Sequence, residues 1–218
     1  MALSTDSITE RIVDALGFLT DDAFRYFKSY SHFRRKDSEG YSYLTIDVTT
    51  RNRSAYNLAF YVGTRVDPLE NAIRALRGDD AKLDHWSRSI NTYTANIGPN
   101  STNWDHPTAG HWPMQCDDDL GTSIPLVSEF IRDGILPFLN SNTSAESVRR
   151  TLLDTPGKTQ NLMPHHQIFG ADVLAGDIDR LLADHKILDE RYQRWIERLR
   201  QDFDAFYKLC NSELSGSA

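Results

Sequence analysis

The sequence predicts an α+β fold, with an antiparallel sheet from the N-terminal half covered by helices and a helical C-terminal half. The first observation is a stretch of two-residue hydrophobic period between Tyr41 and Arg65, which is typical of paired strands. The second is apolar spacing of three and four from Ser123 onward, which indicates amphipathic helices. Strands followed by helices form the pattern of an α+β fold.

The stretch Tyr41–Arg65 contains two alternating segments. In the first, Leu44, Ile46 and Val48 alternate with polar residues, and the same period returns between Tyr56 and Val62. The link over residues 50–54 is polar and contains an asparagine, which tolerates turn geometry. We therefore expect an antiparallel hairpin with one buried face and one solvent-exposed face.

Helices are predicted on both sides of this hairpin. Ser4–Leu16 has a capping residue and an amphipathic pattern, so a short helix is expected there. Residues 18–36 are ambiguous: a helical turn and a first strand over Ser31–Lys36 both fit. Asp67 followed by proline, with glutamate at residue 70, is a favourable helix start and predicts a helix over 68–77.

The middle of the chain is less regular. Trp86–Ile97 has the composition of a strand, whereas Pro99–Thr122 is rich in Gly, Pro, Asn and Asp. Because loops of this length are uncommon in compact domains unless they are functional, we expect either a strand near His111–Met114 or a binding loop.

The C-terminal half reads as successive helices. We expect one over 123–139, which closes near Pro137, and a second one capped by Thr143 or Ser144. Helical spacing continues from Ile168 to Leu182, and a last helix is expected from Leu188 to Tyr207. Helices 68–77 and 123–139 are the expected cover of the sheet. The predicted division is an α+β domain over 1–155 and a helical extension over 156–218.

Composition limits the classes of function. The 218 residues are 39% hydrophobic and 25% charged, as in soluble globular proteins, and the net charge is −7. This acidic balance argues against nucleic acid as a partner and fits a basic protein partner. We expect no membrane span and no signal peptide, because the apolar runs are short. Cys116 and Cys210 lie far apart, which favours a reducing compartment and hence the cytoplasm.

Four segments resemble a known family. They are Leu16–Phe18, Ser31–Lys36, Asn57–Gly63 and Gly134–Leu139. Their order is similar to that of domain-of-unknown-function family 4304 (DUF4304), over about residues 8–153. The shared motifs are packing motifs rather than catalytic ones. Some members of this group resemble immunity proteins encoded beside bacterial toxins, so the resemblance implies a role in toxin neutralisation.

One stretch contains residue types that bind metals. His106, His111, Cys116 and Asp117 lie close together in sequence but at no standard zinc spacing, so we expect no metal there. No metal or other cofactor is expected elsewhere in the chain either. A metal-dependent hydrolase that uses His106, His111 and Cys116 is the alternative. The neighbouring carboxylates would suppress the Cys116 thiolate, which disfavours nucleophilic catalysis. The pair at 165–166 is interpreted as surface or capping histidines.

The expected function is protein binding without catalysis, and an immunity protein that masks a toxin is its sharpest form. No catalytic motif is present, although the sequence leaves the question of an enzyme open. Acidic side chains would face a basic active site on the partner. Tryptophans near these acids are equally compatible with a recognition surface and with a core. A homodimer formed through the face from Tyr192 to Tyr207 is a further possibility. The candidate partner-binding residues are Asp79, Asp80, Trp104, Trp112, Asp117, Asp118 and Asp119.

Overall fold

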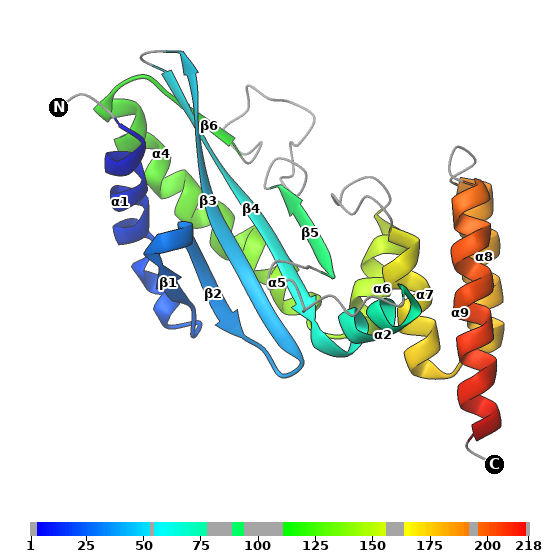
Figure 1. Cartoon of the computed structure of the whole chain (residues 1–218). Helices are drawn as coiled ribbons and strands as arrows, with labels where there is room; N and C mark the ends of the chain where they lie inside the picture. Colours follow the sequence, from blue (N-terminus) through cyan, green and yellow to red (C-terminus); the bar gives the residue numbers. More distant parts are fainter. Residues whose placement is uncertain are drawn as a thin grey trace.

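The computed structural model describes residues 4–52, 55–77, 89–93, 111–155, 164–191 and 196–216. Within these ranges the chain has the predicted α+β architecture: an antiparallel sheet comes from the N-terminal half, and helices fill most of the C-terminal half (Figure 1).

The sheet has strand order β1-β2-β3-β4-β5, and β6 also pairs with β4. Each pairing is antiparallel, as predicted. The segments expected around residues 31–36, 86–97 and 111–114 each contain a strand. The strands are β1 (Arg25–Phe27), β2 (His32–Lys36), β3 (Gly40–Asn52), β4 (Ala55–Val66), β5 (Ile90–Tyr93) and β6 (His111–Met114).

The predicted hairpin is confirmed by β3 and β4. Leu44 pairs with Val62, and Ile46 pairs with Phe60. All four side chains are buried on the same face of the sheet, in agreement with the two-residue period. The link at residues 53–54 lies outside the described residues.

The buried face of the sheet is covered by three helices, α1 (Thr5–Ala15), α4 (Asp117–Phe130) and α5 (Leu136–Ser141), which lie behind it in Figure 1. Their apolar residues and those of the sheet form a first hydrophobic cluster. The helix predicted over 123–139 was wrong at both ends. It begins at Asp117, where acidic residues favour a helix N-terminus, and it passes through the π-helical turn η3 (Ile131–Ile135) into α5. Pro137 does not end the helix, because it lies in the first turn of α5, where proline is tolerated.

Helix α2 (Asp67–Arg77) begins where predicted, but it covers only the end of the sheet. Its buried residues Leu69 and Ile73 belong to a second hydrophobic cluster, which also contains Val66 and Ile90 from that end. They pack on α7 (Pro164–Ala175), which approaches closely at Gly170. A Cβ atom there would lie 2.9 Å from a methyl carbon of Leu69, so glycine permits the contact. The sequence pattern showed that α2 is amphipathic but not which element it faces.

Helices supply most of the second cluster, which adjoins one end of the sheet (Figure 1). Besides α2 and α7 they are α6 (Ala145–Asp154), α8 (Ile178–Arg191) and α9 (Ile196–Gly216). Ser144 caps α6, as predicted. The single helix expected from Leu188 to Tyr207 is instead assigned as α8, which ends at Arg191, and α9, which begins at Ile196; residues 192–195 lie outside the described residues. The predicted division at 155/156 stays a prediction. No described helix combines the length and the apolar character that a membrane crossing requires.

Candidate functional site

A groove lies between α1 and the segment β1–η2, where η2 is the short helical turn Lys28–Tyr30. Its volume is about 390 Å³. Helix α1 supplies one wall, and three residues of the 26–31 segment supply the other. The lining residues are Thr5, Asp6, Thr9, Glu10, Val13 and Asp14 on α1, with Tyr26, Lys28 and Ser31 opposite.

Local sequence explains the α1 wall. The Ser7 N–H donates to Ser4 Oγ (3.1 Å) and the Ser4 N–H donates to Ser7 Oγ (2.9 Å), which fixes the start of the helix. Ile8 and Ile12 are buried against the sheet. The three acidic residues of α1 follow one another at intervals of four, so the helical period gathers them into one exposed stripe beside the groove.

The opposite wall is an irregular segment. Ala23 and Ser31 both have positive φ, at 62° and 47°, in a region that non-glycine residues rarely adopt. These two positions reverse the chain on either side of β1 and η2, and they bring Tyr26 and Lys28 to face α1. This explains why residues 18–36 were ambiguous: short turns of this kind have no hydrophobic period.

The groove has an acidic character. Asp6, Glu10 and Asp14 bring three carboxylates to the α1 wall, against the single ammonium group of Lys28. All four residues are exposed, and no ion pair joins the three carboxylates to any residue that the structure describes. Their charges therefore add, and the groove attracts cationic groups.

The acidic residues 117–119 form the first turn of α4, next to α1. An ion pair of 3.1 Å joins Asp117 to Arg11. Asp119 accepts hydrogen bonds from the backbone N–H groups of Gln115 (2.7 Å) and Cys116 (3.1 Å), and these bonds lower its carboxyl pKa. The sequence placed this run in the irregular segment Pro99–Thr122, and that was wrong: it is a helix N-terminus, which favours negative charge. Asp118 is exposed.

The structure separates the other predicted site residues. Trp112 is only 2% exposed and packs in the core, so its ring is not available to a partner. His111 is buried in β6, whereas Cys116 is exposed before α4. The structure describes no third ligand that joins these two residues in a metal-binding group. The remaining candidates Asp79, Asp80, Trp104 and His106 lie outside the described residues.

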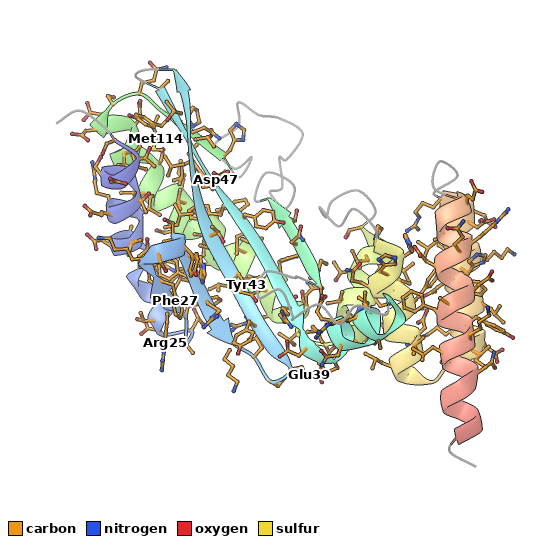
Figure 2. All side chains as sticks on the ribbon, in the orientation of Figure 1. Arg25, Phe27, Glu39, Tyr43, Asp47 and Met114 are labelled. Atoms are coloured by element: carbon orange, nitrogen blue, oxygen red, sulfur yellow. The ribbon has the colours of Figure 1, made fainter. Side chains whose placement is uncertain are left out.

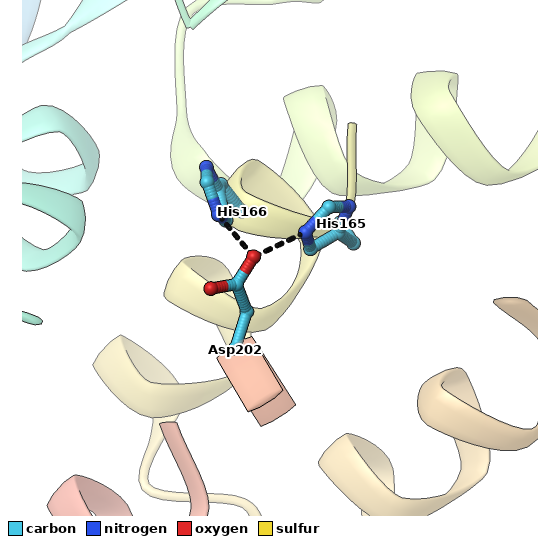
Figure 3. A group of neighbouring side chains, drawn as sticks. All are labelled: His165, His166 and Asp202. Atoms are coloured by element: carbon cyan, nitrogen blue, oxygen red, sulfur yellow. Dashed lines mark hydrogen bonds and ion pairs between the residues drawn. The ribbon is translucent and has the colours of Figure 1, made fainter. Parts of the chain in front are cut away.

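A different group combines metal-ligand types: His165 and His166 in the first turn of α7, with Asp202 on α9 (Figure 3). Both histidine Nε2 atoms lie near one carboxylate oxygen, Asp202 Oδ2, at 2.9 and 2.8 Å. The histidines are buried, so the earlier interpretation as surface residues was wrong. The adjacent histidines were a visible signal. Their partner was not visible, because it follows more than 30 residues later on another helix.

The face of the sheet opposite α1 and α4 carries aromatic and basic side chains. The strand register places Arg25, Phe27, Tyr43 and Asp47 on this face, and all four are labelled in Figure 2. The guanidinium of Arg34 lies over the ring of Phe27, 4.6 Å from its centroid, in a cation–π contact. Burial raises the pKa of the Asp47 carboxyl. This surface is thus chemically distinct from the acidic groove.

Five charged residues form an ion network that joins α6, α7 and α8. Arg149 donates to both oxygens of Asp184, at 2.6 and 2.8 Å, and its Nε atom lies 2.9 Å from Asp172 Oδ1. Arg180 donates to Asp172 (2.7 Å) and to Glu146 (2.8 Å). Because Asp172 and Asp184 are buried, they depend on these cations for their charge.

Asp172 should make stability depend on pH. Burial and the neighbouring charge of Asp184 raise its pKa from 3.8 to about 7, although Arg149 and Arg180 oppose the shift. Between these values the folded state binds more protons than the unfolded state, so the stability contributed by Asp172 is complete below pH 4 and is lost as pH rises to about 7. The difference in free energy of unfolding between the wild type and Asp172→Asn should therefore fall by a few kcal/mol between pH 4 and pH 7, because one pKa unit corresponds to about 1.4 kcal/mol.

Urea unfolding of both proteins between pH 4 and pH 9 measures this difference. Parallel stability curves over that range would contradict the raised pKa of Asp172. If the stability of the wild type relative to Asp172→Asn instead rose with pH, the pKa of Asp172 would be lowered rather than raised.

Comparisons with protein-family models, with curated proteins and with solved structures find no match to this chain. The resemblance to DUF4304 stays a prediction.

Proposed function

We propose that this protein acts without catalysis, by holding a basic segment of another protein in the groove between α1 and β1–η2. The observation that carries the proposal is the stripe of Asp6, Glu10 and Asp14 along a groove of about 390 Å³. A groove of this size fits a few side chains of a partner, and its charge selects lysine and arginine.

The stripe is unfavourable for the helix that contains it. Like charges four residues apart destabilise an isolated helix by about 0.2–0.5 kcal/mol per pair. Asp14 also lies in the last turn of α1, where the helix dipole disfavours an anion. Cationic side chains of a partner would remove both penalties, so binding and the stability of α1 should be coupled.

Immunity against a bacterial toxin is the sharpest version of this proposal, and it rests on the resemblance to DUF4304. In this version the chain covers a basic active site, and Asp118 on the neighbouring α4 extends the acidic surface. A toxin partner would stop bacterial growth when expressed alone, and coexpression of this chain would restore growth.

Charge reversal of the stripe tests the proposal. The triple variant Asp6→Lys, Glu10→Lys and Asp14→Lys should weaken binding of the partner captured by the wild-type chain at least about 100-fold, at roughly 1 kcal/mol for each charge contact. The salt dependence of binding should fall as well, because it arises from these charges. Calorimetric titration of the purified partner at two salt concentrations gives both quantities.

The matched control carries the same change in net charge on exposed residues of α6 and α8. It is Asp154→Lys with Asp179→Lys and Glu190→Lys. This control should bind the partner within a few-fold of the wild type. Equal weakening in both triple variants would show that only net charge matters, and wild-type affinity in the groove variant would exclude the groove as the binding site.

A further inference from the structure

We propose that His165, His166 and Asp202 bind one divalent transition-metal ion, with Zn²⁺ the best match. Each residue offers one ligand atom, and these atoms all lie within 4.8 Å of one another. The site is at the contact of α7 with α9, in the second hydrophobic cluster, whereas the acidic groove lies beside α1 at the other end of the molecule (Figure 1). The inference is therefore independent of the proposed function.

The ligand set suits zinc. Two imidazole nitrogens and one carboxylate oxygen form the protein ligands of many zinc sites, in which water occupies the fourth tetrahedral position. Zinc–ligand distances of about 2.0–2.2 Å place neighbouring ligand atoms roughly 3.3 Å apart. The Nε2–Oδ2 distances of 2.9 and 2.8 Å are shorter, so the group would open by about 0.5 Å to admit the ion.

The direction of the two rings supports a shared ligand. Consecutive residues in a helix point about 100° apart, yet His165 and His166 both direct Nε2 to the same oxygen atom (Figure 3). Their ring centroids are only 4.5 Å apart. The helix start at Pro164 places both residues in the first turn of α7.

The surroundings are suited to a metal site. Each histidine is 6% exposed, and the Asp202 side chain is 16% exposed. Phe169 and Phe206 pack against the imidazole rings, at centroid distances of 6.0 and 6.3 Å. Asp202 lies between Leu199 and Phe206 in the buried stripe of α9, so a bound cation would sit among largely apolar side chains, where its attraction to the carboxylate is strong.

Hydrogen bonding alone is the competing role for this group, and the two roles differ at Nε2. A hydrogen bond to Asp202 requires a proton on each Nε2 atom, whereas a metal ion requires a lone pair there. Asp202→Asn separates the two roles, because the amide oxygen still accepts a hydrogen bond but is a much poorer metal ligand.

The test is calorimetric titration of the full chain with Zn²⁺ alone, after treatment with a chelator and dialysis. The wild type should bind one ion with high affinity at the His165 site, and Asp202→Asn and His166→Gln should each weaken that binding at least tenfold. Even the loss of a residue that only hydrogen-bonds to a metal ligand lowers metal affinity about 10- to 100-fold, so the loss of a ligand itself should have at least that effect. His185→Gln is the matched control, since the His185 ring contacts Phe203 in the same bundle, at a centroid distance of 4.0 Å, but lies outside the group. It should leave the affinity unchanged.

Imidazole NMR spectra of the wild-type chain keep the proposal testable if a variant fails to fold. Zn²⁺ should shift the ring signals of His165 and His166 and leave those of His185 in place. Equal zinc affinity in the wild type and Asp202→Asn, or unshifted His165 and His166 signals at saturating zinc, would overturn the proposal and leave hydrogen bonding as the role of the group.

Discussion

Replacing Arg149 with methionine is expected to lower the free energy of unfolding by about 3–5 kcal/mol at pH 8, because it leaves buried carboxylates without their cation. Asp184 receives both of its described hydrogen bonds from Arg149, and Asp172 would keep only Arg180. Methionine has a similar length and is apolar, so the change removes the charge and preserves much of the packing. Urea unfolding of the variant and the wild type measures the loss.

Arg150→Met is the control for this prediction. Arg150 is exposed on the same helix, and its replacement should change stability by no more than about 0.5 kcal/mol. The loss in Arg149→Met should shrink toward pH 4, because Asp172, whose pKa is raised to about 7, is then protonated and no longer needs the guanidinium. A loss that is small at pH 8, or equally large at pH 4, would show that Arg149 does not balance the buried acids.

Trp112→Ala is the second change with a large expected effect, a loss of about 3–5 kcal/mol in the free energy of unfolding. The indole ring is buried between the sheet and α4, and it meets Phe60 and Phe130 edge to face, at centroid distances of 6.0 and 5.6 Å. Removing it would leave a large cavity in the first hydrophobic cluster. Chemical unfolding monitored by circular dichroism measures the change without relying on tryptophan fluorescence.

Trp112→Phe is the matched variant. It keeps an aromatic ring between Phe60 and Phe130, and it removes an indole N–H that has no acceptor among the residues the structure describes. Trp112→Phe should therefore lower the free energy of unfolding clearly less than Trp112→Ala does. If Trp112→Ala instead retained wild-type stability and lost partner binding, Trp112 would be a recognition residue rather than a core residue.

Much of the fold was predictable because its elements have regular hydrophobic periods. The alternation of Leu44, Ile46 and Val48 identified the hairpin and its buried face, and the serine caps at residues 4 and 144 marked two helix starts. The start of α4 was missed because Gly121, a poor helix former, separates the acidic residues 117–119 from the apolar part of the helix. The hydrophobic period also could not predict that α2 packs on α7, because it indicates which face of a helix is buried but not which element covers that face.

The candidate site was less predictable, because it depends on contacts between distant segments. The stripe of Asp6, Glu10 and Asp14 is visible at four-residue spacing, but the opposite wall of the groove is an irregular segment, flanked by the positive φ angles of Ala23 and Ser31, that has no hydrophobic period. The predicted acidic surface at 117–119 is explained in part by the start of α4, where Asp119 is used as a helix cap.

The measurement that tests the account most directly is amide hydrogen exchange of the full chain, alone and bound to its captured partner. The acidic-groove proposal predicts slower exchange in α1 and in residues 25–31, with little change in α8 and α9. Slower exchange confined to α8 and α9, with α1 unchanged, would contradict it.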